Sequence, residues 1–232
     1  MVQNKLHLHE EILLLALKDE KGTIHSGTMY QYAIGGALLS ELLLHKRIHV
    51  VESRWRKLVE ATDSTPVGDP LLDECLQRIV QSKRRASLET WVSRFAHIGK
   101  LKHHIAAKLC ASGILRAEED KVLLFFTRKI YPEINPVPEN EIIERVRQAI
   151  FTDTTEIDPR TIILIALTKH ADILLALFKR SELKPRKKRI KDITEGNVVG
   201  EAARDAIQAV QAAAAIAAIM PAIIAASTTA ST

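Results

Sequence analysis

Residues 160–178 read RTIILIALTKHADILLALF and carry apolar side chains on every face of a helix. Asp158-Pro159 comes directly before them. This pair is a strong helix start, because Asp can cap the first turn and Pro is tolerated at its first position. A helix that is apolar all round is normally buried. The stretch therefore predicts a helix from Arg160 to Phe178 near the centre of a helical protein.

Two earlier segments extend this predicted core. Met29 to Leu44 is helical in pattern and holds Gly35-Gly36 in its interior. Each glycine costs a helix about 1 kcal/mol relative to alanine. The pair therefore indicates close packing or close approach of a ligand. Leu6 to Leu17 begins with alternation and continues as an apolar run, which predicts a short extended entry into a buried helix.

The rest of the chain predicts short helices and little sheet. Ile48 to Val51 is β-branched and predicts a strand, and Lys184 to Lys191 is read as a solvated basic linker. Ile114-Leu115 and Val122 to Phe126 predict a β-hairpin, with the polar stretch Glu118 to Asp120 between them. Further helices are expected over 71–80, 88–95, 98–112 and 141–151, and loops over 62–70 and 131–138.

The alanine-rich segment 201–226 is expected to pack as a buried helix inside a single domain over residues 1–232. Its apolar run from Ala212 to Ala226 is shorter than the roughly 20 residues that cross a bilayer, and Pro221 interrupts it. A membrane anchor is the alternative reading. Residues 1–11 lack the apolar core of a secretory leader.

Composition limits the class of partner. Charged residues make up 26% and hydrophobic residues 47% of the 232, which is typical of a globular protein. The net charge of +5 suits an anionic partner, either a phospholipid surface or a nucleic acid. Cys75 and Cys110 lie in apolar helical patterns and are read as buried thiols in a reducing compartment.

Five segments, in order, carry a resemblance to a known family. They are Leu6 to Leu17 with Asp19 and Gly22, Gly36 to Leu42 with Arg47-Ile48, Pro66 to Glu74, Leu109 to Pro132, and Arg160 to Leu174. Over practically its whole length the chain resembles the Golgi phosphoprotein 3 family, as a prokaryotic or divergent member.

The resemblance implies a mainly α fold: a helical bundle wrapped by amphipathic helices, with one or two small β-hairpins. It also implies a non-enzymatic adaptor that is cytoplasmic and peripheral on the cytosolic face of a membrane. Eukaryotic members bind phosphatidylinositol 4-phosphate and the cytosolic tails of Golgi glycosyltransferases. The expected partners are therefore an anionic phospholipid or phosphoinositide, together with tails of membrane proteins.

The family's headgroup pocket is only partly kept. Where the family has a Trp and an Arg from the second segment, the corresponding positions here are near Ser26 and at Gly35. The family's two later Arg residues align with Gly99 and Lys102. Only Lys102 retains a charge. A phosphomonoester is held best by planar guanidinium groups, so we expect diffuse attraction to anionic lipid with weak preference for the phosphoinositide.

We expect headgroup contacts on the helix before the hairpin and at the Arg54-Trp55-Arg56-Lys57 run, where an aromatic side chain lies among cations. A solvated basic face and a core role for Trp55 are the alternatives. The candidate headgroup residues are Lys100, Lys102, Arg54 and Arg56, and the candidate membrane-inserting residues are Val122, Leu123, Leu124 and Phe125.

Other classes of protein are less well supported. A helix that ends at Gly113 before a hairpin also describes a winged-helix DNA reader, but residues 98–112 hold few side chains that read bases, so no nucleic acid is expected. A protein scaffold without lipid specificity is a third reading. His45 with His49 and the adjacent His103-His104 have no carboxylate or thiol at ligand spacing, so no metal site is expected. No phosphate-binding loop or serine nucleophile motif occurs, so neither a cofactor nor catalysis is expected.

Overall fold

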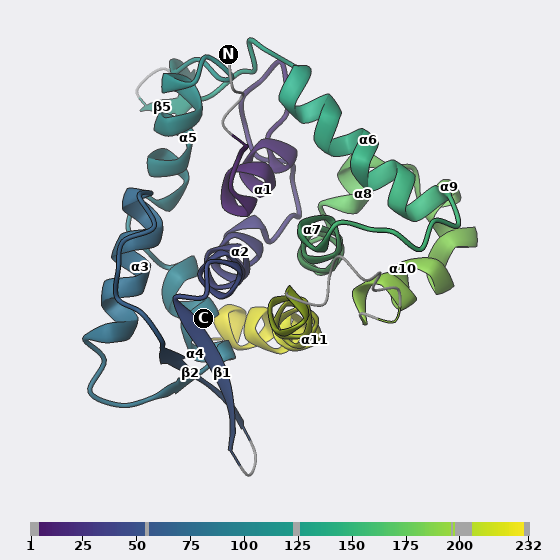
Figure 1. Ribbon diagram of the computed structural model, residues 1–232. Helices are drawn as coiled ribbons and strands as arrows, with labels where there is room; N and C mark the ends of the chain where they lie inside the picture. The colour runs from purple at the N-terminus through teal and green to yellow at the C-terminus, as the bar shows by residue number, and fades with distance from the viewer. Residues whose placement is uncertain (1–4, 54–55, 123–125, 196, 198–205, 230–232) are drawn as a thin grey trace.

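In a computed structural model the chain is described over residues 5–53, 56–122, 126–195, 197 and 206–229. The fold is mainly α with two small antiparallel sheets, as predicted (Figure 1). The helices are α1 (Leu8–Ala16), α2 (Tyr30–Leu44), α3 (Pro70–Val80), α4 (Leu88–Ala96), α5 (Leu101–Ala111), α6 (Val137–Phe151), α7 (Pro159–His170), α8 (Leu174–Leu177), α9 (Arg180–Leu183), the 3-10 turn η1 (Lys184–Arg186), α10 (Lys187–Thr194) and α11 (Ile207–Thr229). The strands are β1 (Ile48–Ser53), β2 (Arg56–Ala61), β3 (Ala86–Ser87), β4 (Glu118–Val122) and β5 (Phe126–Ile130).

The centre of the molecule is formed by α2 and α7, which pack against each other and against α1 and α11 (Figure 1). Every residue from Tyr32 to Leu43 of α2 is buried, and so is every residue from Thr161 to Thr168 of α7. The predicted central position of the helix that opens at Pro159 is confirmed.

The two glycines of α2 are packing positions. A Cβ atom at Gly35 would lie 2.5 Å from the Val92 carbonyl oxygen of α4. A Cβ atom at Gly36 would lie 2.8 Å from a Leu167 methyl group of α7 and 3.1 Å from Ile216 of α11. The absence of side chains therefore lets neighbouring helices approach α2 on two sides, which confirms the close-packing interpretation.

The central helix is shorter than predicted. It ends at His170, and the chain turns at Asp172, which is left-handed with φ 58°, before α8 begins at Leu174. An unbroken helix to Phe178 was therefore wrong. Asp is one of the few residues that adopt the left-handed region readily. Apolar residues lie on both sides of the turn, so the apolar pattern of the sequence continues through it and does not indicate that the helix ends.

The β4–β5 hairpin is formed by other residues than predicted. β4 pairs antiparallel with β5, so that Glu118 lies opposite Ile130 and Val122 opposite Phe126. The polar stretch Glu118 to Asp120, predicted to lie between the two strands, is therefore itself part of strand β4. Ile114 and Leu115 lie before this hairpin and are buried in the core. The predicted strand at Ile48 is confirmed, and its partners β2 and β3 form a second small sheet.

The basic segment after residue 183 is helical rather than a solvated linker. Arg186 donates to the Phe151 carbonyl oxygen at 2.7 Å and Arg189 to that of Ala149 at 3.1 Å, so these cations hold the end of α6. Lys187 and Lys188 stay exposed. The predicted loop over 131–138 is also too long, because α6 begins at Val137.

The alanine-rich helix α11 packs against α7, α2 and α4, as expected for a buried C-terminal helix. Its buried residues include Val210, Ile216 and Met220. Among the described residues, none of the helices has the length and apolar character that a bilayer crossing requires.

Candidate functional site

The amino end of α5 carries two of the predicted headgroup residues. Lys100 precedes the helix in a left-handed conformation with φ 58° and is exposed. Lys102 is half-buried, and its Nζ atom lies 5.8 Å from the centre of the Tyr131 ring. A cation near an aromatic face in this way is attracted by the ring quadrupole. Lys102 is thus held against the protein, whereas Lys100 points into solvent.

Strand β5 and Tyr131 complete this surface. His103 Nδ1 and the Tyr131 hydroxyl are hydrogen-bonded at 2.6 Å, which joins α5 to the base of the hairpin. Figure 1 shows β5 beside α5 at the same end of the molecule. We call this surface the α5–β5 basic face; it consists of Lys100, Lys102, His103, His104, Arg128 and Lys129.

The pKa values on this face record an excess of positive charge. Burial lowers the pKa of His103, and the neighbouring basic groups, Lys102 first, lower it further. Burial and the Arg128 charge likewise lower the pKa of Lys102. A nearby anion would favour the charged forms of both groups, so the face is electrostatically suited to an anionic ligand.

Part of that charge is neutralised by β4. Arg128 donates from Nη2 to Asp120 at 2.6 Å, and Lys129 lies opposite Glu119 in the sheet. Among the described residues no ion pair involves Lys100 or Lys102. Lys129 is likewise in no ion pair among the described residues, so the three lysines of the face are available to a ligand.

The other predicted residues do not join this face. Arg56 begins β2, and Figure 1 shows the β1–β2 hairpin at the opposite end of the molecule from β5. Arg56 therefore lies apart from the α5–β5 basic face, and Arg54 lies outside the described residues. Of the predicted inserting residues, Leu123, Leu124 and Phe125 also lie outside the described residues, and for Val122 only the strand backbone is described.

The family pocket positions fall in different surroundings. Gly99 and Ser26 are exposed, and nothing lies within 4 Å of a Cβ atom built at Gly99. Gly35 is buried against the backbone of α4, where no longer side chain fits. An arginine could not extend toward a headgroup from that position.

A buried ionic network around α1 was missed at the sequence level. Glu10 and Glu11 of α1 are both 2% exposed. Glu10 does cap the helix, accepting from the His7 backbone at 2.7 Å, but it also pairs with Lys108 at 3.1 Å. Glu11 pairs with Arg145 at 2.8 Å. Two adjacent acids at the start of an apolar run were the available signal, because only one of them can serve as the cap.

The comparisons with known proteins agree with the family resemblance that the five sequence segments carry. The model of the family described as Golgi phosphoprotein 3 (GPP34) matches residues 8–210. The chain belongs to the Golgi phosphoprotein 3 family. A curated relative, the vacuolar protein sorting-associated protein 74 of Eremothecium gossypii, is 30% identical over a match that covers 73% of this chain. The match covers 60% of that relative's length, so the chain corresponds to part of it.

Membership of the Golgi phosphoprotein 3 family accounts for the arrangement just described. The match begins at Leu8, the first residue of α1, and ends at residue 210 in the first turn of α11, so it contains α1, α2 and α7 but not most of α11. The α5–β5 basic face also lies within the match.

Proposed function

We propose that this protein is a non-enzymatic peripheral membrane adaptor that docks on anionic lipid headgroups through the α5–β5 basic face. The observation that supports the proposal is the position of Lys100 and Lys102 at the amino end of α5, beside β5, where no ion pair among the described residues neutralises them. Family membership supports the membrane-surface class, and the printed name of the relative, a vacuolar sorting protein, supports a role in membrane traffic. Tails of membrane proteins are the proposed protein partners.

The lipid selectivity that we propose is weak. Lys102 is an ammonium group against a ring, and the α5–β5 basic face presents one arginine, Arg128, which already pairs with Asp120. Without a free guanidinium fork the attraction comes from diffuse charge, which salt screens over about 8 Å at physiological ionic strength. The affinity of the protein for vesicles of phosphatidylserine or phosphatidylinositol 4-phosphate should then follow the negative charge of the vesicle.

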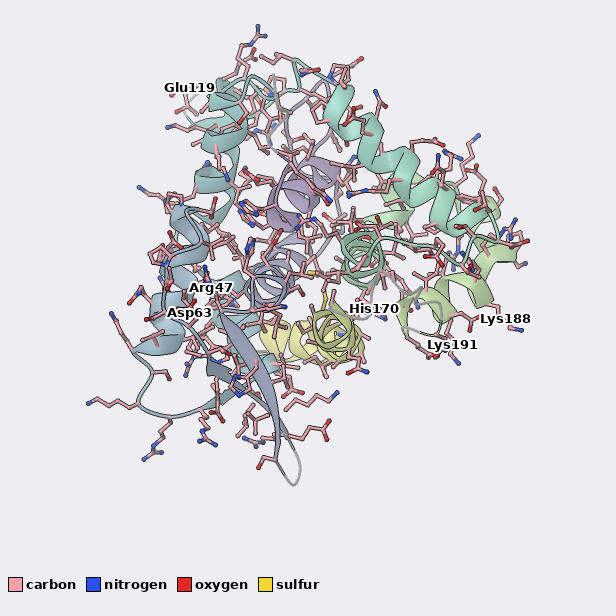
Figure 2. All side chains as sticks on the ribbon, viewed as in Figure 1. Arg47, Asp63, Glu119, His170, Lys188 and Lys191 are labelled. Carbon is pink, nitrogen blue, oxygen red and sulfur yellow. The ribbon has the colours of Figure 1, made fainter. Side chains whose placement is uncertain are left out.

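Vesicle cosedimentation tests this proposal. Vesicles of neutral lipid, phosphatidylserine, or phosphatidylinositol 4-phosphate at matched charge are compared at low and high salt, with duplex DNA in parallel. The Lys100→Glu, Lys102→Glu variant should lose most of the binding to anionic vesicles. The matched control is Lys187→Glu, Lys188→Glu, which changes the net charge equally on α10; Figure 2 shows Lys188 far from Glu119 of the hairpin.

Three outcomes would overturn parts of the proposal. Equal loss in both charge-reversal variants would mean that net charge, not the α5–β5 basic face, attracts the lipid. Tight and salt-resistant selection of the phosphoinositide would mean that a specific pocket lies elsewhere. Binding to DNA but to no anionic vesicle would exclude the lipid-docking function.

A further inference from the structure

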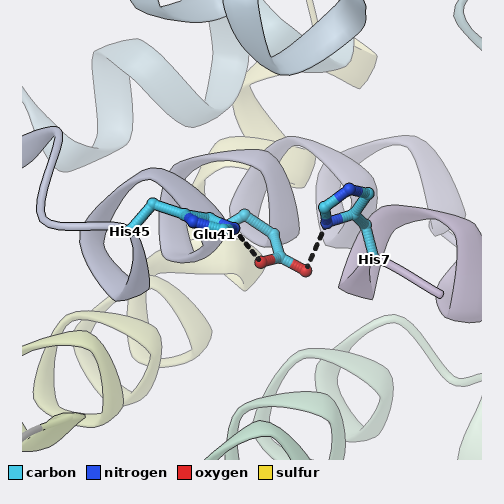
Figure 3. Close-up of side chains that lie close together, drawn as sticks. All are labelled: His7, Glu41 and His45. Carbon is cyan, nitrogen blue, oxygen red and sulfur yellow. Dashed lines mark ion pairs between the residues drawn. The ribbon is translucent and has the colours of Figure 1, made fainter. Parts of the chain in front are cut away.

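Three side chains from two parts of the chain meet at the carboxyl end of α2. His7 is the residue before α1, Glu41 lies in the last turn of α2, and His45 is the residue that follows the end of α2. His7 Nδ1 is 3.5 Å from Glu41 Oε1, and His45 Nε2 is 3.7 Å from Glu41 Oε2 (Figure 3). One ligand atom from each residue lies within 4.8 Å of the other two. The two imidazoles approach the carboxylate from opposite sides, as Figure 3 shows.

The carboxylate of Glu41 is fixed by donors other than the histidines. The Leu8 backbone donates to Oε1 at 2.6 Å, and Arg160 donates to Oε1 at 2.7 Å and to Oε2 at 3.1 Å. A carboxylate offers about four acceptor positions, so one position on Oε2, the atom nearest His45, remains. Metal-binding carboxylates are commonly oriented by such outer hydrogen bonds.

The surrounding network has room for a further positive charge. Four buried carboxylates contact three lysine or arginine side chains, so the remaining negative charge is balanced either by a histidine cation or by a bound metal ion. The carboxylates are Glu10, Glu11, Glu41 and Asp69, and the basic groups are Lys108, Arg145 and Arg160.

The separations fit a tetrahedral metal ion. Zinc binds imidazole nitrogen and carboxylate oxygen at about 2.0–2.2 Å, which places neighbouring tetrahedral ligands about 3.4 Å apart. His45 Nε2 lies 3.7 Å from Oε2, the oxygen with a free position, which is close to this value. His7 Nδ1 lies 3.5 Å from the other oxygen, Oε1, and one ligand atom from each of the three residues lies within 4.8 Å of the other two. The side chains of His7 and His45 are 23% and 40% exposed, so an ion can reach them from solvent.

We propose that His7, Glu41 and His45 form a binding site for a divalent metal ion of the zinc class, with a fourth position open to water. The ring of His7 stacks on that of His9, with centroids 5.5 Å apart, which fixes the orientation of one ligand. A metal at this position joins the entry to α1 to the end of α2. Its binding therefore stabilises the folded chain.

The test is Zn²⁺ binding by the chelator-treated, full-length protein. Calorimetry should give one Zn²⁺ per chain, with a raised Tm in the presence of Zn²⁺. The His45→Gln variant should bind Zn²⁺ more than about 100-fold more weakly, because even outer partners of a metal ligand are each worth about 10–100-fold. His45 is partly exposed, so this variant should fold. His49→Gln is the matched control, since His49 is half-buried on β1, where its Nδ1 is hydrogen-bonded to Thr62, and lies outside the cluster.

A second measurement identifies the ligand geometry. Co²⁺ bound to two imidazoles, a carboxylate and water should give the strong visible absorption of a tetrahedral site, and the His7→Gln variant should remove it. The absence of Zn²⁺ binding to the wild-type chain would overturn the proposal. So would binding that both His45→Gln and His7→Gln leave unchanged, or an octahedral Co²⁺ spectrum. In those cases the histidines serve only as hydrogen-bond partners of Glu41.

Discussion

The buried charge of Glu41 is stabilised in the folded protein by the guanidinium group of Arg160. Glu41 is fully buried, and Arg160 from α7 makes a two-point contact with it across 119 residues of sequence. Arg160 also donates to the Leu6 carbonyl oxygen at 2.8 Å. One guanidinium therefore ties α7 both to α2 and to the segment before α1.

We expect Arg160→Met to destabilise the fold by about 3–5 kcal/mol, because it leaves the buried Glu41 charge uncompensated. Arg78→Met is the matched control, since Arg78 and Glu74 form an exposed pair at 2.6 Å that is worth about 0–1 kcal/mol. Urea denaturation measures both. A loss of less than about 1 kcal/mol for Arg160→Met would show that Glu41 is solvated or protonated when unpaired.

Glu139, in the first turn of α6, gives a pH-dependent contribution to stability. Burial raises its pKa above the ordinary carboxyl range, and the neighbouring charges of Glu133 and Asp19 raise it further. The stabilisation is fully present below the unfolded-state pKa and is lost as the pH rises through the higher folded-state value.

The wild-type Tm should therefore fall between about pH 5 and about pH 8, where the folded state binds more protons than the unfolded state. Glu139→Gln removes the titrating group and should flatten this slope and raise the Tm at the upper pH. A 1 kcal/mol gain corresponds to about 2–4 °C for a chain of this size. Scanning calorimetry of the wild type and of Glu139→Gln across this pH range measures the effect. If the Tm of both proteins fell equally with pH, Glu139 would be excluded as the source of the pH dependence.

At the scale of elements, the packing of α2 distinguishes its two glycines. A methyl group at Gly35 meets backbone of α4, which cannot move alone, whereas one at Gly36 meets a leucine side chain that can rotate. Overpacking lowers the free energy of unfolding by about 1–3 kcal/mol. The higher helix propensity of alanine relative to glycine raises it by about 1 kcal/mol. Gly35→Ala should thus be net destabilising in urea denaturation, and Gly36→Ala nearer to neutral. The reverse order would mean that α4 is more adaptable than α7.

The α5–β5 basic face makes a second prediction at this scale. Anionic vesicles should raise the pKa of His103, since lipid charge offsets the cations that lower it. In the Lys100→Glu, Lys102→Glu variant the pKa should already be raised without lipid and should change little on its addition. NMR titration of the imidazole measures both. An unchanged pKa in wild-type protein with vesicles bound would place the lipid elsewhere.

For the whole molecule, we propose that the chain folds as a single domain. The buried apolar residues from α1 to α11 form one cluster, and Ile216 of α11 is fully buried in it. Ile216→Ala should lower stability by about 2–5 kcal/mol. The control Leu175→Ala, at a residue 52% exposed on α8, should change it little.

Tryptophan fluorescence, which includes the buried Trp91 of α4, and far-UV circular dichroism follow the transition. The two signals should change together in urea, for the wild type and for Ile216→Ala. Separate transitions would divide the chain into more than one cooperative unit.

The sequence by itself determined the mainly α class and the central place of the 160–170 helix, because the apolar periodicity of a segment carries both. The family resemblance rested on five segments in order. For Gly35-Gly36 the sequence left close packing and close approach of a ligand both open, and only the packing of α4, α7 and α11 against α2 decided between them. The sequence also placed Lys100 and Lys102 at the start of a helix before a hairpin, and this pair remains a proposed headgroup site.

Only the tertiary structure decided which distant side chains meet. It placed Glu41 between His7, His45 and Arg160, buried Glu11 against Arg145, and separated Arg56 from the α5–β5 basic face. Periodicity reports that a residue is buried but not its partner, because contacts across long stretches of sequence depend on how helices pack. For that reason the buried ionic network, and the approach of His7 to the Glu41–His45 pair, became visible only in three dimensions.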